Sequence, residues 1–165
     1  MKILHTFLLF GLCSLSALAQ TDVSLHINHQ LESNAFAFDV AAENNLENQF
    51  DVTRLQYYVS NVVITHDGGQ TTTVPNSYHL INANEATDIE LGNFDITTLE
   101  KVTFGIGLPN DVNHLDPSTY PSDSPLAPQA QSMHWGWSAG YRFICLEGMA
   151  GDNLDQLYQL HALGD

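Results

Sequence analysis

The chain has 165 residues, enough for one domain, and carries 19 Asp and Glu against 4 Lys and Arg, for a formal net charge of −15. Phosphate backbones are bound by clustered cations, so this composition excludes nucleic acid as a partner. The charge is compatible with a basic partner or with a metal ion.

Residues 1–19 have the pattern of a secretory signal peptide. Lys2 supplies the positive charge, Leu4 to Leu15 form an apolar run, and Ala17-Leu18-Ala19 is a small-residue cleavage site. The apolar run is too short to span a membrane. We therefore expect a mature chain that starts at Gln20, has no transmembrane segment and resides in the periplasm or outside the cell.

Strand patterns follow in chain order up to residue 108. Val23, Leu25 and Ile27 alternate with polar residues, as in a strand with one buried face. Residues 50–66 are rich in aromatic and β-branched side chains, and the Asp67-Gly68-Gly69 sequence after them is a hairpin-turn signal. Further short strands are predicted from TTTV, YHLIN, TDIEL and KVTFGIGL, at residues 71–74, 78–82, 87–91 and 101–108.

A long loop interrupts this pattern at residues 109–132. It contains five prolines and no regular hydrophobic period. Loops of this length inside compact domains are typically functional or disordered, and the aromatic-rich exit of this one argues against disorder. Strand patterns return at residues 139–148 and 157–163. The sequence predicts one mainly β domain over residues 20–165, an antiparallel sandwich or barrel with a long proline-rich loop.

The residues that could hold a metal are mostly histidines. After residue 19 the chain has seven of them and one cysteine, Cys145, which cannot form an internal disulfide and is interpreted as a small buried core residue. Metal-binding motifs such as H-E-x-x-H and C-x-x-C are absent from the sequence, as is the G-x-S-x-G elbow of hydrolases. Imidazole sites without cysteine suit copper, zinc, nickel or iron, and the abundant Asp and Glu side chains would suit calcium. Isolated strand histidines such as His66 and His79 are more often structural than ligands.

Two histidines bracket the long loop: His114 lies near its start and His134 directly after its end. If the ends of the loop meet, the two imidazoles come together and could bind a metal. An alternative interpretation needs no metal. Trp135, Trp137 and Tyr141 could form a hydrophobic plug that holds the loop down, because residues two apart in an extended segment share a side.

Four motifs carry a resemblance to a known family. FDVTRLQYYVSNVVI, FGIGLPNDVNHLDP, MHWGWSAGYRFICLEG and YQLHALG occur in this order. Together they resemble the MbnP-like domain family, exported copper-binding proteins associated with methanobactin operons, and the similarity runs from about Val23 to the last residue. The resemblance implies a β-sandwich-like domain that binds copper. It also implies a di-haem partner resembling MauG and bacterial cytochrome c peroxidases, which oxidises a tryptophan to kynurenine.

On this resemblance the candidate metal ligands are His114, His134 and His161, and the candidate oxidised residue is Trp135 or Trp137. Opening the indole ring creates a ligand-capable nitrogen, whereas indole itself is only a donor. The implied function is copper uptake or storage without catalysis, so no catalytic residue is expected. The alternative is an interaction module that docks a partner through the aromatic loop. The family pattern also continues beyond Asp165, so a shortened member or an incomplete gene product is expected.

Overall fold

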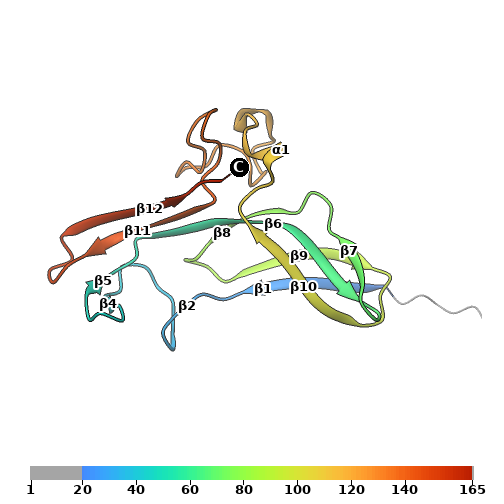
Figure 1. Cartoon of the computed structure of the whole chain (residues 1–165), viewed down its shortest axis with the longest axis horizontal. Helices are drawn as coiled ribbons and strands as arrows, with labels where there is room; N and C mark the ends of the chain where they lie inside the picture. The colour runs from blue at the N-terminus through green and yellow to red at the C-terminus, as the bar shows by residue number, and fades with distance from the viewer. Residues whose placement is uncertain (1–19, 165) are drawn as a thin grey trace, which may run out of the picture.

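The structure of the protein, a computed structural model, describes residues 20–164, and its regular secondary structure is almost entirely antiparallel strands (Figure 1). The predicted fold class, a mainly β antiparallel sandwich, is therefore confirmed. The signal peptide predicted at residues 1–19 lies outside the described residues. Between residues 20 and 164, no helix has the length and apolar character needed to cross a membrane.

The largest sheet is organised around one long strand, β6 (Arg54–His66). In this sheet β6 pairs with β10 (Leu99–Ile106), β7 (Gln70–Thr73), β8 (Tyr78–Asn82) and β11 (Ile144–Ala150). The strand β11 also pairs with β12 (Gln156–Ala162) and with β5 (Gln49–Phe50), and β5 pairs with β4 (Ala42–Glu43). Two smaller sheets join β1 (Thr21–Ile27) to β9 (Thr87–Phe94) and β2 (Gln30–Leu31) to β3 (Asn34–Ala35). The strands longer than two residues have ends within five residues of the runs predicted from the sequence, whereas the two-residue strands β2, β3 and β4 were not predicted.

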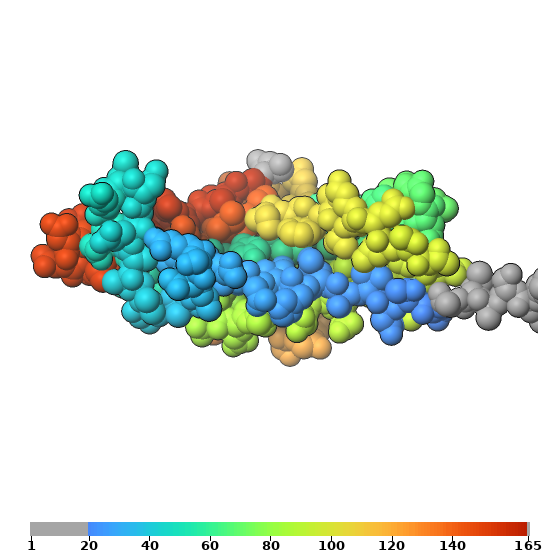
Figure 2. Space-filling view, turned by 90° about the horizontal axis from the view of Figure 1, so that it is seen from below, coloured from blue at the N-terminus to red at the C-terminus, as the bar shows by residue number. Residues whose placement is uncertain are grey.

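A bulge in β6 allows side chains along most of this strand to pack into one hydrophobic core, the first of two. The register with β10 shifts between the pairs Gly105–Ser60 and Thr103–Val63, and Asn61 there has a φ of 54°. A bulge adds one residue to a strand and so changes which residues face inward. Odd-numbered residues before Asn61 and even-numbered residues after it consequently reach the same core, which contains Val59, Val62, Ile64, Ile81 and, from the facing pair of strands, Val23, Ile89 and Leu91. Figure 2 shows β1 running along this side of the elongated molecule.

The proline-rich loop packs over the other side of β6 and forms a second core. It contains the short helices α1 (Asn110–Asn113) and η1 (Pro117–Thr119). Leu126 and Met133 are buried with Tyr58 and Tyr141, and the hydroxyl of Tyr58 donates a hydrogen bond of 2.9 Å to the carbonyl of Pro125. The loop is thus an ordered cover over the sheet, as its aromatic exit indicated.

The predicted Asp67-Gly68-Gly69 turn joins β6 to β7, and its first residue also fastens the neighbouring loop. The carboxylate of Asp67 accepts hydrogen bonds from the Thr97 hydroxyl and from the backbone N–H groups of Thr97 and Thr98, the last at 2.8 Å. These bonds, led by that of the Thr97 hydroxyl, lower the pKa of Asp67 from 3.8 to about 2.

The lowered pKa of Asp67 predicts an acid-dependent loss of stability. A carboxyl with a depressed native pKa stabilises the fold above its unfolded pKa, and that contribution is lost as the pH falls through the native value. We expect the difference in unfolding midpoint between the parent and Asp67→Ala to be constant near neutral pH and to shrink between pH about 4 and about 2. Chemical denaturation across this range measures it, with the exposed Glu90→Gln as control. A difference independent of pH would contradict the prediction.

Candidate metal centre

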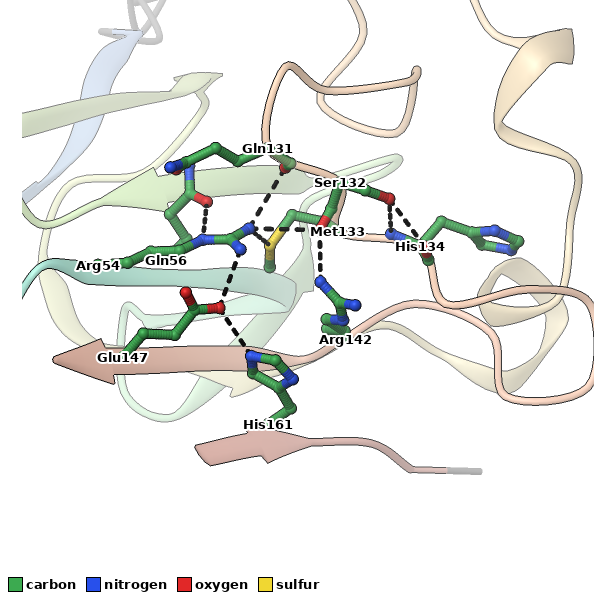
Figure 3. A network of polar contacts seen from close by, with 9 residues as sticks. All are labelled: Arg54, Gln56, Gln131, Ser132, Met133, His134, Arg142, Glu147 and His161. Carbon is green, nitrogen blue, oxygen red and sulfur yellow. Dashed lines mark hydrogen bonds and ion pairs between the residues drawn. The ribbon is translucent and has the colours of Figure 1, made fainter. Parts of the chain in front are cut away.

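A group of polar side chains lies on one face of three adjacent strands. In the register of the sheet, Cys145 of β11 is opposite Gln56 of β6 on one side and His161 of β12 on the other. Glu147 is opposite Arg54. Directly opposed residues in antiparallel strands project to the same face, and so do residues two apart in one strand. The sheet therefore brings together residues that are up to 107 positions apart, Arg54 and His161 being the outermost (Figure 3).

Glu147 is the centre of the polar contacts in this group. Its Oε1 atom accepts from Arg54 Nη1 at 3.1 Å and lies 2.8 Å from Nε2 of His161. All three side chains are largely buried, with exposed fractions of 9%, 17% and 12% for Arg54, Glu147 and His161. Burial alone raises the pKa of Glu147, but the hydrogen bond to His161 and the charge of Arg54 outweigh it, so the pKa lies below its ordinary value. Glu147 is thus an anion at neutral pH.

The thiol of Cys145 adjoins this network and is fully buried, as the core interpretation predicted. Burial raises the pKa of Cys145, while the guanidinium groups of Arg54 and Arg142 act in the opposite direction. Ligand atoms of Cys145, Glu147 and His161 all lie within 4.8 Å of one another. Among residues 20–164 this is the one group of three Cys, His, Asp or Glu side chains that meets that distance.

The two tryptophans lie on a tight turn next to this group. The backbone N–H of Trp135 donates to the Gly140 carbonyl at 2.9 Å, and the backbone N–H of Gly140 donates to the Gly136 carbonyl at 2.8 Å. Gly136 has a φ of 110°, a conformation that side chains other than glycine disfavour. The segment is therefore not extended. Trp135 and Trp137 keep 51% and 65% of their surface exposed, so the plug interpretation is wrong for both indoles.

Each indole lies beside a different predicted histidine. The ring of Trp135 meets His161 edge-on, with 5.4 Å between ring centroids, and its face lies 4.7 Å from the guanidinium carbon of Arg142. The ring of Trp137 meets His134 edge-on at 6.1 Å. The turn thus places one tryptophan against the strand cluster and the other against the histidines of the loop.

His134 has a buried ring nitrogen with no hydrogen-bond partner. Its Nδ1 atom accepts from the Gly136 N–H at 3.3 Å, and its ring packs on Tyr141 with 5.0 Å between centroids. Its Nε2 atom is buried and unpaired within the described part of the chain. Burial lowers the pKa of His134, the charge of Asp116 raises it, and the neighbouring His114 lowers it, so the pKa lies below its ordinary value. The imidazole of His134 is therefore neutral at neutral pH, with its lone pair on Nδ1, which faces the Gly136 N–H, and its proton on Nε2.

His114 lies at the C-terminal end of α1, where its Nδ1 atom is 3.2 Å from the carbonyl oxygen of Trp137. This contact joins the start of the loop to the segment that leaves it, so the condition set for a His114–His134 pair is met, and its metal binding stays a prediction. His66 and His79 are placed differently. His66 contacts Asp67 and Thr72 beside the hairpin turn, and His79 contacts Ser77, which agrees with the structural roles predicted for them.

The predicted ligands therefore fall into two neighbourhoods on either side of the tryptophan turn. His114 and His134 belong to the loop, and His161 belongs to the strand cluster with Cys145 and Glu147. Sequence reasoning missed the last two residues. Cys145 and Glu147 are two residues apart in a predicted strand, so the sequence could have shown that their side chains lie on the same face of the sheet. That His161 joins them depends on the register of β11 with β12.

Comparisons with known proteins agree with this architecture. A family model described as MbnP matches residues 20–165. A solved structure described as MbnP from Methylosinus trichosporium superposes with a TM-score of 0.66 at 14% sequence identity, over 87% of this chain and 62% of that one. At this identity the likeness shows the fold alone, and the present chain spans less than two thirds of that protein. A search of curated proteins gave no match.

Proposed function

The chain belongs to the MbnP family, and we propose that it is an exported, non-catalytic protein that binds copper for uptake or storage. The observation that carries the proposal is the contact between the Trp135 and His161 rings, at 5.4 Å between centroids. It joins one of the two candidate oxidised residues to a candidate ligand. The two residues come from separate segments of the chain and meet only in the folded protein.

The donor groups around the tryptophan turn fit copper. Imidazole nitrogens are ligands that copper prefers over the hard oxygen ligands favoured by calcium and magnesium. A buried polar atom without a partner is costly, and Nε2 of His134 is such an atom among the described residues. Coordination of a metal ion by Nε2 would satisfy it, with the imidazole proton moved to Nδ1 and the Gly136 N–H released. The candidate ligands are His114 and His134 from the loop and His161 from β12. They lie on either side of the tryptophan turn, so the turn would rearrange for all three to hold one ion, which the protein would carry as cargo.

Oxidation of one tryptophan by a di-haem partner resembling MauG is the second part of the proposal. Two oxygen atoms from a haem-activated oxidant, dioxygen or peroxide, enter at the C2–C3 bond of the indole, which breaks. Hydrolysis then releases the formyl group as formate and leaves kynurenine. The indoles of Trp135 and Trp137 are more than half-exposed, which supports access by a partner protein. The aniline nitrogen and ketone so formed would lie beside His161 or His134.

Copper titration of the mature protein from its native host tests the function. We expect copper to bind in preference to calcium or magnesium, and His114→Ala and His161→Ala each to weaken binding at least about tenfold, the lower range for changes around a metal site. His66→Ala should leave the affinity unchanged, because His66 is bonded at the hairpin end of β6.

Two other outcomes are informative. Variants that all titrate like the parent would show that the ligand set is wrong. A parent protein that binds no copper would contradict the function and favour the alternative, an interaction module that docks a partner through the exposed indoles of Trp135 and Trp137.

A further inference from the structure

The strand cluster offers a donor that the loop histidines do not, the thiol of Cys145. The side chain of Cys145 lies in the second core together with the thioether of Met133, and both are almost completely buried. Cys145, Glu147 and His161 are the three side chains whose ligand atoms lie within 4.8 Å of one another. Thiolate and thioether sulfur favour Cu(I), whereas imidazole and carboxylate alone do not select it.

We infer that Cys145, His161 and Glu147 form a binding site for Cu(I), with the thiolate of Cys145 as the ligand that selects this ion. The inference rests on the proposed function, because it assigns the oxidation state and part of the ligand set of the same metal. Binding breaks the S–H bond of Cys145 and forms an S–Cu bond. The proton passes to solvent, and the copper stays Cu(I).

The distances suit such a site after a small adjustment. A metal–sulfur bond of about 2.3 Å and a metal–nitrogen bond of about 2.0 Å leave the two donors at most about 4.3 Å apart. The present separations are within 4.8 Å, so small side-chain rotations bring the donors together. The 2.8 Å contact between Glu147 Oε1 and His161 Nε2 already places these two side chains beside the thiol. Copper would replace this contact, and the Nε2 proton would move to Nδ1.

The charges around the cluster favour a monovalent ion. The chain after residue 19 has 3 basic residues, Arg54, Lys101 and Arg142, and two of them lie here. Arg54 contacts Glu147 at 3.1 Å and the Met133 sulfur at 3.3 Å, and both Arg54 and Arg142 donate to the Ser132 carbonyl (Figure 3). Two guanidinium cations balance the Glu147 carboxylate and a Cys145 thiolate. Cu(I) adds one positive charge to this buried group and Zn(II) adds two, so the cost of burying charge is lower for Cu(I).

Anaerobic titration of the mature protein with Cu(I), in competition with a chromophoric Cu(I) chelator, tests this site. We expect a near-ultraviolet sulfur-to-copper charge-transfer band in the parent, and little displacement of Cu(I) by excess Zn(II). Cys145→Ala should lose the band and bind Cu(I) at least about tenfold more weakly. His66→Ala is the matched control and should keep both properties. Far-ultraviolet circular dichroism verifies that each variant is folded. The charge-transfer band of the parent tests for a sulfur ligand even if a variant does not fold.

The outcomes separate this inference from the proposed function. A parent that binds copper without the charge-transfer band, and a folded Cys145→Ala that titrates like it, would overturn the thiolate site and leave a histidine-based copper protein. A parent that binds neither Cu(I) nor Cu(II) would overturn both. Preferential binding of Zn(II) would overturn the assignment to Cu(I).

Discussion

Protein purified from its native host is expected to carry a mass gain of about 4 Da on Trp135 or Trp137, the gain expected for conversion of indole to kynurenine, which exposes a nitrogen able to bind a metal. Replacing the modified tryptophan by phenylalanine should lower copper loading in the host, because a benzene ring cannot be converted to kynurenine. Peptide mass spectrometry locates the modification, and metal analysis of each variant measures the loading.

The other tryptophan provides the matched control for this prediction. Both indoles are more than half-exposed, so a Phe substitution at either position should change the free energy of unfolding by less than about 1 kcal/mol. Phe at the unmodified position should therefore leave loading intact. Recombinant protein made without the di-haem partner should lack the mass gain and bind copper more weakly. Unmodified tryptophan at both positions, with full copper loading, would remove the oxidation step from the proposed function.

Gly148→Ala, at the one glycine of β11, is expected to cause a large loss of stability. A Cβ atom at this position would lie 2.1 Å from the Asp51 carbonyl oxygen and 2.6 Å from the Tyr158 hydroxyl. That hydroxyl also donates to the Asp51 carbonyl at 2.7 Å, so neither group can move without breaking a hydrogen bond. Overpacking of this kind costs about 1–3 kcal/mol in free energy of unfolding, and two contacts this short place Gly148→Ala at the upper end. Relieving these contacts would also displace β11, the strand that carries Cys145 and Glu147.

Urea denaturation of Gly148→Ala measures this cost, and Gly105→Ala serves as the control. Gly105 also lies in a strand, but a Cβ there meets its nearest neighbour, the Ser60 carbonyl oxygen, at an ordinary 3.6 Å. The control should unfold within about 0.5 kcal/mol of the parent. Equal stabilities for the two variants would show that the backbone around Asp51 yields more easily than its hydrogen bonds indicate.

Much of the fold could be predicted from local patterns. Alternating residues placed β1 and β10, the aromatic and β-branched run placed β6, and the Asp67-Gly68-Gly69 signal placed the first turn. These signals are local, because side-chain direction in a strand repeats every two residues and glycine supplies the backbone angles of a turn. The same patterns could not show the bulge at Asn61, which depends on how β6 is paired with β10.

For the candidate site too, part could be predicted from the sequence and part depended on the tertiary structure. The sequence by itself determined the residue types available, namely seven histidines after the leader, one cysteine and two tryptophans around a glycine. These types favoured an imidazole site for copper, zinc, nickel or iron, and only the resemblance to the MbnP-like family selected copper. Tertiary structure alone decided that His161 joins Cys145 and Glu147 whereas His114 and His134 lie beside Trp137. Strand register and the turn at Gly136 set these neighbours, because both are fixed by packing and hydrogen bonds between segments that are distant in the chain.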